Sequence, residues 1–179
     1  MRKTKVINFY GGPCSGKSTA AAGLFYKMKI MGHNVELADE FAKECVWEGN
    51  IPMLKDQLWV LAHQNRKILR LAGKVDYIIT DSPVLLSPIY RELYDGALYS
   101  DLLDRIALEC YNMYDNINFM LSRSRDFEAE GRVQDEVASV KIDLEIIDQF
   151  NRLKIPYTQI EGADHASIAY EELMRLYAH

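Results

Sequence analysis

Cysteine is scarce in this 179-residue chain, which has three copies of it, at Cys14, Cys45 and Cys110. The three are far apart and odd in number, so they form neither a disulfide framework nor the paired spacing of a structural zinc site. We therefore expect reduced thiols and no metal centre built on cysteine.

The chain also lacks long apolar runs and a surplus of basic residues. No segment approaches the roughly 18 apolar residues of a membrane-spanning helix. The apolar part of the first segment, MRKTKVINFYGG, is too short for a signal peptide. We therefore expect a cytoplasmic protein without a membrane partner.

The net charge of −5 argues against an extensive contact with duplex DNA, although it is compatible with a local basic patch.

Strand-like and helix-like apolar patterns alternate along the chain, with no repeat and no Pro-rich or Gly-rich linker between them. Such alternation is typical of a parallel sheet with helices on both faces. The sequence therefore predicts one three-layer α/β domain over residues 1–179, built on a five-stranded parallel sheet. The predicted strands are KVINFYGG (5–12), NVELAD (34–39), VDYIITD (75–81), NINFMLSR (116–123) and PYTQIEG (156–162).

Apolar residues at helical spacing predict the helices and their buried faces. The first helix would run over 17–31 and end at Gly32. Further helical segments are expected over 42–47, from Pro52 to about residue 72, and over most of the stretch from 84 to 114. The residues expected to face inward are Leu24, Phe25, Met28 and Met31 in the first helix, and Val140, Leu144, Ile147 and Phe150 in the helix after the fourth strand.

The segment FYGGPCSGKSTAAAGL contains the pattern Gly-x-x-x-x-Gly-Lys-Ser over residues 11–18. A glycine-rich loop between a strand and a helix points backbone N–H groups at a phosphate chain, and the helix dipole adds to the attraction. Lys17 would reach the β- and γ-phosphates, and the Ser18 hydroxyl would bind Mg²⁺. The pattern therefore predicts a P-loop for ATP and Mg²⁺. Its expected binding residues are Gly11, Gly12, Pro13, Cys14, Ser15, Gly16, Lys17, Ser18 and Thr19.

An acid at the end of a buried strand is a second candidate ligand for the metal. Asp81 closes VDYIITD, and ligands gather at the carboxyl ends of strands in open α/β sheets. Asp81 would hold Mg²⁺ directly or through a water molecule, together with Ser18. The alternative is an aspartate that forms a turn or caps a helix before Ser82-Pro83.

The rest of the chain favours a kinase over a switch or a motor. The late segment QIEGAD has no Asn-Lys-x-Asp motif of the kind that GTPases use, and the chain is short for most motor ATPases. LADEFAKE places Asp39 and Glu40 directly after the second strand, where a carboxylate would face the γ-phosphate and take a proton from an acceptor hydroxyl. We expect Glu40 to be this base, with Asp39 as the alternative. Either acid could instead cap the next helix.

A polar segment over residues 123–138 is the candidate for a short lid. Its arginines would stabilise the charge that spreads over the transferred phosphoryl group, and Gly131 could serve as a hinge. The competing interpretation is a solvated loop, because five acids in the same segment could pair with the arginines. On the kinase interpretation, the catalytic residues are Lys17, Glu40, Asp81, Arg123, Arg125 and Arg132.

The acceptor would lie against the helices that follow the second and third strands. DQLWVLAHQNRKILR places Trp59, His63 and Gln64 near helical spacing, so a tryptophan could stack on a base and an amide could read its edge. Side chains of these types are more often found in a core or on a surface than in a base pocket. Tyrosines expected to flank the acceptor pocket are Tyr90, Tyr94 and Tyr99.

The motifs FYGGPCSGKST, LADEFAKE, DYIITDSP and EGRVQDE, in this order, resemble those of a group of small bacteriophage P-loop kinases. This group is similar to thymidylate kinases and, more distantly, to the ribosylnicotinamide kinase domain, and it includes the 5-hydroxymethyl-deoxyuridine DNA kinases. The resemblance implies a sheet of the nucleotide-kinase type, residues 11–18 as the ATP loop, Asp81 as the magnesium acid and Glu40 as the base. Thymidylate kinases typically have Asp-Arg where this chain has Asp81-Ser82, which disfavours a plain thymidylate kinase.

On this resemblance, the expected activity is transfer of the γ-phosphoryl group of ATP to 5-hydroxymethyl-deoxyuridine in phage DNA. The product would be 5-phosphomethyl-deoxyuridine, formed in the host cytoplasm as a step of DNA hypermodification. Two alternatives stay open: a kinase of a free nucleoside or nucleoside monophosphate, and a regulatory NTP-binding module with slow hydrolysis. The sequence is also compatible with either a monomer or a homodimer.

Overall fold

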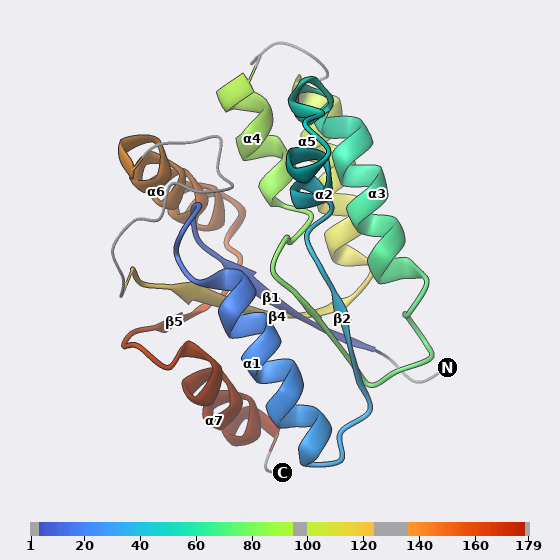
Figure 1. Cartoon of the computed structure of the whole chain (residues 1–179), viewed down its shortest axis with the longest axis vertical. Coiled ribbons are helices and arrows are strands. Elements are labelled where there is room, and N and C mark those ends of the chain that lie inside the picture. The colour runs from blue at the N-terminus through green and yellow to red at the C-terminus, as the bar shows by residue number, and fades with distance from the viewer. Residues whose placement is uncertain (1–3, 95–99, 124–135, 178–179) are drawn as a thin grey trace.

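A parallel β-sheet lies at the centre of the part of the chain that the computed structural model describes, namely residues 4–94, 100–123 and 136–177 (Figure 1). Five strands pair in the order β2-β3-β1-β4-β5, which confirms the predicted sheet. Parallel neighbours need crossover connections, and here helices supply them. The strands are β1 (Lys5–Tyr10), β2 (Val35–Ala38), β3 (Tyr77–Thr80), β4 (Asp115–Leu121) and β5 (Thr158–Ile160).

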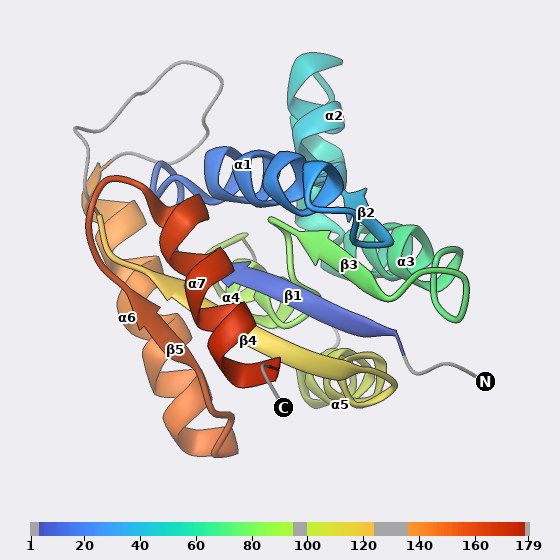
Figure 2. The ribbon, with the colours of Figure 1, turned by 90° about the horizontal axis from the view of Figure 1, so that it is seen from below.

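Helices cover both faces of the sheet and complete a three-layer α/β fold (Figure 2). On one face α1 packs against α7, and on the other lies a layer formed by α3, α4, α5 and α6. No helix of the described residues has the length and apolar character needed to cross a membrane. The helices are α1 (Lys17–Ile30), α2 (Phe41–Trp47), α3 (Gln57–Leu69), α4 (Leu86–Tyr94), α5 (Ser100–Asn112), α6 (Glu136–Leu153) and α7 (His165–Tyr177), with a 3₁₀ turn, η1, at Ile51–Lys55.

The side chains of β1 alternate between two cores, because successive residues of a strand point to opposite faces. Val6 and Tyr10 pack with the α3–α6 layer, whereas Ile7 and Phe9 pack with α1 and α7. A strand buried on both faces has the near-continuous apolar run that KVINFY shows. The glycine-rich loop that follows β1 therefore starts from a strand anchored on both of its faces.

The helix expected from Pro52 onward begins later, at Gln57. The η1 turn occupies its predicted start, and the Asp56 carboxylate accepts a 3.0 Å hydrogen bond from the Trp59 amide. This contact caps α3 and satisfies one of its unpaired N–H groups. The long helical stretch expected after the third strand forms two helices, α4 and α5, on either side of residues 95–99, which lie outside the described residues.

The first helix buries most of the face predicted for it. Leu24 and Met28 are fully buried, but Met31 is 61% exposed. α1 ends at Ile30, so Met31 lies beyond the last helical turn and cannot reach the core below it.

The buried face of α6 agrees only in part with the predicted one, since Phe150 is buried and Ile147 packs against the core as expected. Ile142, Ile146 and Phe150 are buried, whereas Val140 and Leu144 are 44% and 63% exposed. The helix carries two apolar stripes with the same four-residue spacing, and spacing alone does not distinguish them. Packing against the α3–α6 core decides that the stripe through Ile146 is the inner one.

This difference predicts unequal effects of two similar truncations on α6. Ile146→Ala should lower the free energy of unfolding by about 2–5 kcal/mol, because it leaves a cavity in the core. Leu144→Ala should change it by less than about 1 kcal/mol, because the side chain is mostly solvated. Urea denaturation of both variants would measure the difference, and a larger loss for Leu144→Ala would show that the inner stripe is assigned wrongly.

Candidate active site

The loop between β1 and α1 adopts backbone conformations that suit glycine. Gly16 precedes α1 with φ +89, and Cys14 has φ +62, a region that side chains seldom adopt. A Cβ atom at Gly12 would lie 2.4 Å from the Ser139 carbonyl oxygen, so any side chain there would collide with α6. The loop thus leads its backbone directly into the start of α1, where the positive end of the helix dipole attracts an anion.

Lys17 and its neighbours provide polar groups along this loop. The Lys17 ammonium donates hydrogen bonds to the carbonyl oxygens of Gly11 (2.7 Å) and Gly12 (2.8 Å). The Ser15 hydroxyl is buried and has no hydrogen-bond partner, and Ser18 lies partly buried in the first turn of α1. A buried hydroxyl without a partner is unfavourable, and a phosphate oxygen would supply one. The residues of the loop therefore fit the phosphate chain of a nucleotide.

A cavity lies between the phosphate loop and the start of α7. Cys14 and Thr19 line it together with Asp164 and His165, which lie at the start of α7. The Asp164 carboxylate accepts a 3.0 Å hydrogen bond from the Ser167 amide, and its hydrogen bonds to Ser167 lower the pKa of this group. This carboxylate therefore stays ionised as the cap of α7 at the cavity wall.

Asp81 comes directly after β3 and shares one pocket with Lys17. Asp81 is 6% exposed, and its Oδ1 has no hydrogen-bond partner. A buried carboxylate oxygen in this condition is unfavourable unless a cation or a donor binds it. Mg²⁺ in phosphate sites is held by one or two protein oxygens in addition to phosphate oxygens. Asp81 and the Ser18 hydroxyl are therefore a donor set that fits Mg²⁺.

The pocket that contains Lys17 and Asp81 extends from the phosphate loop to α2, α3 and α4. Glu40 lies in the wall with them. Tyr90 and Tyr94 line the pocket from α4, with ring centroids 6.4 Å apart. A recess with apolar walls and a few charged groups suits an organic ring that carries a reactive polar substituent. Other wall residues are Lys43, Val46, Leu54, Val60 and Leu86.

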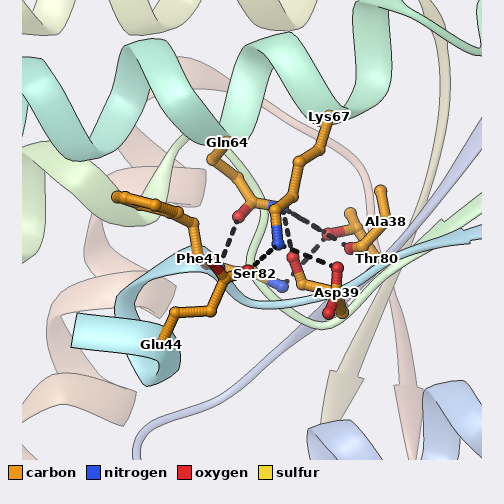
Figure 3. Close-up of polar contacts among 8 residues, drawn as sticks. All are labelled: Ala38, Asp39, Phe41, Glu44, Gln64, Lys67, Thr80 and Ser82. Carbon is orange, nitrogen blue, oxygen red and sulfur yellow. Dashed lines mark hydrogen bonds and ion pairs between the residues drawn. The ribbon is translucent and has the colours of Figure 1, made fainter. Parts of the chain in front are cut away.

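The two acids after β2, Asp39 and Glu40, have different surroundings, and Figure 3 shows those of Asp39. Asp39 is exposed, and its carboxylate forms a 2.9 Å ion pair with Lys67 of α3, whereas Glu40 lines the pocket. Lys67 also pairs with Glu44 of α2 at 2.5 Å. Burial opposes the charge of Lys67, but its hydrogen bonds to Glu44 and Asp39 outweigh that effect and raise its pKa. The structure therefore places Glu40, and not Asp39, in the wall of the pocket that Lys17 and Asp81 also line.

Gln64 does not offer its amide to a base edge. It is 2% exposed, its Oε1 accepts a 3.0 Å hydrogen bond from the Phe41 amide, and its Nε2 donates to the Asp39 carbonyl oxygen at 3.2 Å. Figure 3 shows this amide between α3 and the end of β2. Both ends of the amide are thus hydrogen-bonded inside the protein, although Gln64 also lines the pocket. The structure therefore favours a core residue over a base reader at this position.

Trp59 and His63 contact α2 and not an open pocket. The Phe41 ring stacks on His63 with centroids 4.3 Å apart and meets Trp59 edge-on at 4.8 Å. Phe41 belongs to a small cluster with Cys45 and other residues of α2, η1 and α3. The two aromatic side chains of α3 therefore hold α2 in place, and the structure does not bring them to the acceptor pocket.

Arg123 is the lid arginine that falls within the described residues. Its Nε donates to Asp143 Oδ2 at 2.7 Å, and its Nη1 donates to the Pro13 carbonyl oxygen at 2.9 Å. Its Nη2 is buried and has no hydrogen-bond partner. The guanidinium thus lies against the phosphate loop, and its Nη2 amino group has no hydrogen-bond partner. Arg125, Gly131, Arg132 and Tyr99 lie outside the described residues and stay predictions.

Nothing in the sequence singles out Asp143, an acid among the apolar residues of KIDLEII in α6. Its Oδ1 accepts a 2.5 Å hydrogen bond from the Gly12 N–H, while its Oδ2 accepts the bond from Arg123. The Asp143 carboxylate therefore accepts a hydrogen bond from a loop N–H of the kind that donates to phosphate oxygens. The contact joins residues 131 positions apart, so only the fold reveals it.

The position of Asp143 predicts an effect on nucleotide affinity. Asp143→Asn removes a negative charge beside the loop but keeps an acceptor for the Gly12 N–H. A non-hydrolysable ATP analogue should then bind roughly 3- to 10-fold more tightly, equivalent to about 1 kcal/mol. Isothermal titration calorimetry measures this affinity, with Asp148→Asn on the exposed side of α6 as the matched control. Weaker binding by Asp143→Asn would mean that the carboxylate supports the nucleotide-binding form of the loop.

Solved structures of other proteins share this fold, among them two that match almost all of this chain. The NadR protein in complex with NR has a TM-score of 0.77 at 13% sequence identity, over 96% of this chain and 51% of the NadR chain. This chain therefore spans about half the length of NadR. Thymidylate kinase from Ehrlichia chaffeensis has a TM-score of 0.64 at 17% identity, over 98% of this chain and 99% of that one. Identities this low show a common fold and nothing finer.

Comparison at the level of sequence places the chain in a family. No curated protein sequence matches it. The profile of the AAA domain matches residues 6–167, which include the phosphate loop, both acids after β2, Asp81 and α6. NTP and Mg²⁺ are the typical ligands of this class. The chain belongs to the AAA domain family and is a P-loop NTPase whose fold resembles that of the nucleotide kinases.

Proposed function

We propose that this protein is an ATP- and Mg²⁺-dependent kinase that transfers the γ-phosphoryl group to a hydroxyl of a nucleic-acid component. One observation carries the proposal: Lys17, Glu40 and Asp81 line a single recessed pocket, and Asp81 has a buried oxygen without a hydrogen-bond partner. A module that only bound or slowly hydrolysed NTP would need no organic recess beside its phosphate loop. The recess supports an acceptor other than water.

In the proposed mechanism, Lys17 leaves the carbonyl oxygens of Gly11 and Gly12 and contacts the β- and γ-phosphates. When bound, Mg²⁺ would supply positive charge that offsets the charge of the phosphates. Asp81 and Ser18 are the residues that would hold it. Phosphoryl transfer requires mostly positioning and electrostatic stabilisation, since its transition state is loose in most analyses.

Two further side chains act at the reacting groups. Glu40 orients the acceptor hydroxyl and takes its proton on the carboxylate. The unused Nη2 of Arg123 donates to the oxygens of the transferred group, where negative charge spreads. Arg125 and Arg132 are proposed to act with Arg123.

Within this activity, we take 5-hydroxymethyl-deoxyuridine in phage DNA as the first acceptor, with 5-phosphomethyl-deoxyuridine as the product. The four motifs of the chain support this choice. The modified base would have to leave the DNA stack to reach a recessed pocket, as bases do for other base-modifying enzymes. Tyr90 and Tyr94 line the recess from α4 and provide ring faces for it.

A free nucleoside or nucleoside monophosphate is the second candidate acceptor. The pocket is walled by α2, α3 and α4, and a small untethered molecule enters such a recess more easily than a nucleotide within DNA. The net charge of −5 also suits an acceptor that requires little contact with a DNA backbone.

A transfer assay with γ-labelled ATP tests the function and separates the acceptors. Hydroxymethyluracil DNA, in single and double strands, ordinary DNA, nucleosides and monophosphates would be offered in parallel, with Lys17→Ala as the inactive control. We expect label in hydroxymethyluracil DNA alone. Label only in a free nucleoside or monophosphate would select the second acceptor. ATP hydrolysis with no labelled acceptor would refute the kinase proposal.

Glu40 and Asp39 should respond very differently to loss of charge. Glu40→Gln should lower acceptor phosphorylation by roughly 10²–10⁴-fold, the usual range for loss of a general base. Asp39→Asn should keep most of it, because that carboxylate pairs with Lys67. Single-turnover rates at saturating ATP measure both, and the opposite ranking would move the base to Asp39.

Asp81→Asn should weaken the binding of Mg²⁺ more than it lowers the stability of the fold. The change keeps the shape of the side chain and removes its charge, so the Mg²⁺ concentration for half-maximal rate should rise roughly 10- to 100-fold. A magnesium titration measures this, with Asp101→Asn on the exposed start of α5 as the control. An unchanged titration curve would assign Asp81 to a structural turn.

A further inference from the structure

The amide of Gln64 bridges the backbone on both sides of Glu40. Its Oε1 accepts from the Phe41 N–H at 3.0 Å, and its Nε2 donates to the Asp39 carbonyl oxygen at 3.2 Å. The residue is 2% exposed, so these bonds do not compete with bulk water. A pair of bonds to the preceding and following residues restricts the peptide groups that carry Glu40.

Gln64 also satisfies a backbone donor at the start of α2. Glu40 occupies the N-cap position of α2 with an extended backbone (φ −69, ψ 115), yet its side chain makes no capping hydrogen bond. The Phe41 N–H is one of the first donors of α2, which have no partner within the helix. Gln64 of α3 accepts this donor from outside. The first N–H of α2 is thus satisfied from α3, and the Glu40 carboxylate lines the pocket.

The same amide connects Glu40 to the strand that carries Asp81. Gln64 Nε2 donates to Thr80 Oγ1 at 3.2 Å, and Thr80 Oγ1 also accepts from the Ser82 N–H at 3.2 Å. Thr80 is fully buried and directly precedes Asp81. Figure 3 shows the dashed contacts from Gln64 to the ends of both strands. One side chain thus joins the backbone around Glu40 to the turn around Asp81.

We propose that Gln64 is a positioning residue that sets the distance and orientation of Glu40 relative to Asp81. This rests on the proposed function, in which Glu40 orients the acceptor hydroxyl and Asp81 the metal. An amide is required because one end must accept from Phe41 and the other must donate to Asp39 and Thr80. Neither a carboxylate nor an apolar side chain offers that combination.

Gln64→Met tests the proposal, since it keeps the length of the side chain and removes both hydrogen-bonding ends. The rate of acceptor phosphorylation at saturating substrates should fall roughly 10- to 100-fold, the effect of a misplacement of about 1 Å. The affinity for ATP should change by less than about twofold, because the phosphate loop makes those contacts. The matched control is Gln149→Met, which removes another buried amide, on α6, that is 6% exposed and lies outside this pocket.

A double-mutant cycle separates positioning from general loss of stability. If Gln64 acts through Glu40, Gln64→Met should lower the rate much less in a Glu40→Gln background than in the wild type. Equal losses in both backgrounds would overturn the proposal. Thr80→Val gives a second test that keeps side-chain shape and removes the hydroxyl that accepts from Gln64 and from the Ser82 N–H, while the bonds of Gln64 to Phe41 and Asp39 remain. It should lower the rate while ATP affinity stays constant, and an unchanged rate would remove this link from the proposal.

Hydrogen exchange gives a readout that does not depend on activity. The Phe41 amide should exchange faster in Gln64→Met than in Gln149→Met, because its acceptor is gone. If the Phe41 amide exchanges faster in Gln64→Met but this variant transfers the phosphoryl group at the wild-type rate, Gln64 is only structural and its positioning role is refuted. A wild-type protein that phosphorylates no acceptor would instead refute the proposed function itself.

Discussion

The site depends on the parallel pairing of three neighbouring strands. β3 lies between β2 and β1, and all three run in the same direction, so their carboxyl ends meet at one edge of the sheet. In this register both Asn8 of β1 and Ala38 of β2 pair with Thr80 of β3. The phosphate loop, Glu40 and Asp81 follow these positions within a few residues. Segments that are distant in the chain therefore face one pocket.

Polar groups at this edge fall into two kinds. The amide of Gln64 and the hydroxyl of Thr80 have partners within the protein, and such buried networks hold backbone segments in one arrangement. The Asp81 Oδ1, Arg123 Nη2 and Ser15 hydroxyl are buried without hydrogen-bond partners. Unsatisfied buried groups are rare because they are unfavourable. Together, the two kinds give a rigid frame around groups that a nucleotide and its metal would satisfy.

Charge at the phosphate loop is balanced without a nucleotide. Lys17 donates to loop carbonyl oxygens, and Asp143 accepts from the Gly12 N–H while it pairs with Arg123. Lys17 would have to leave these carbonyl oxygens to contact a phosphate chain, whereas Arg123 offers its Nη2, which has no hydrogen-bond partner. The loop is thus held by side chains from α1, from α6 and from the residues directly after β4.

The sequence by itself determined the α/β class, the five parallel strands and the GxxxxGKS loop, because these follow from local patterns: apolar runs, their spacing and glycines at defined positions. The acids after the second and third strands were also predictable, since carboxyl ends of parallel strands share an edge. Only the tertiary structure separated Glu40 from Asp39, because the difference lies in Lys67, which comes from α3. It also decided which stripe of α6 is buried, showed that the Gln64 amide is hydrogen-bonded inside the protein and brought Asp143 to Gly12. These outcomes depend on which distant side chains meet, and a local pattern carries no record of contacts between residues so far apart in the chain.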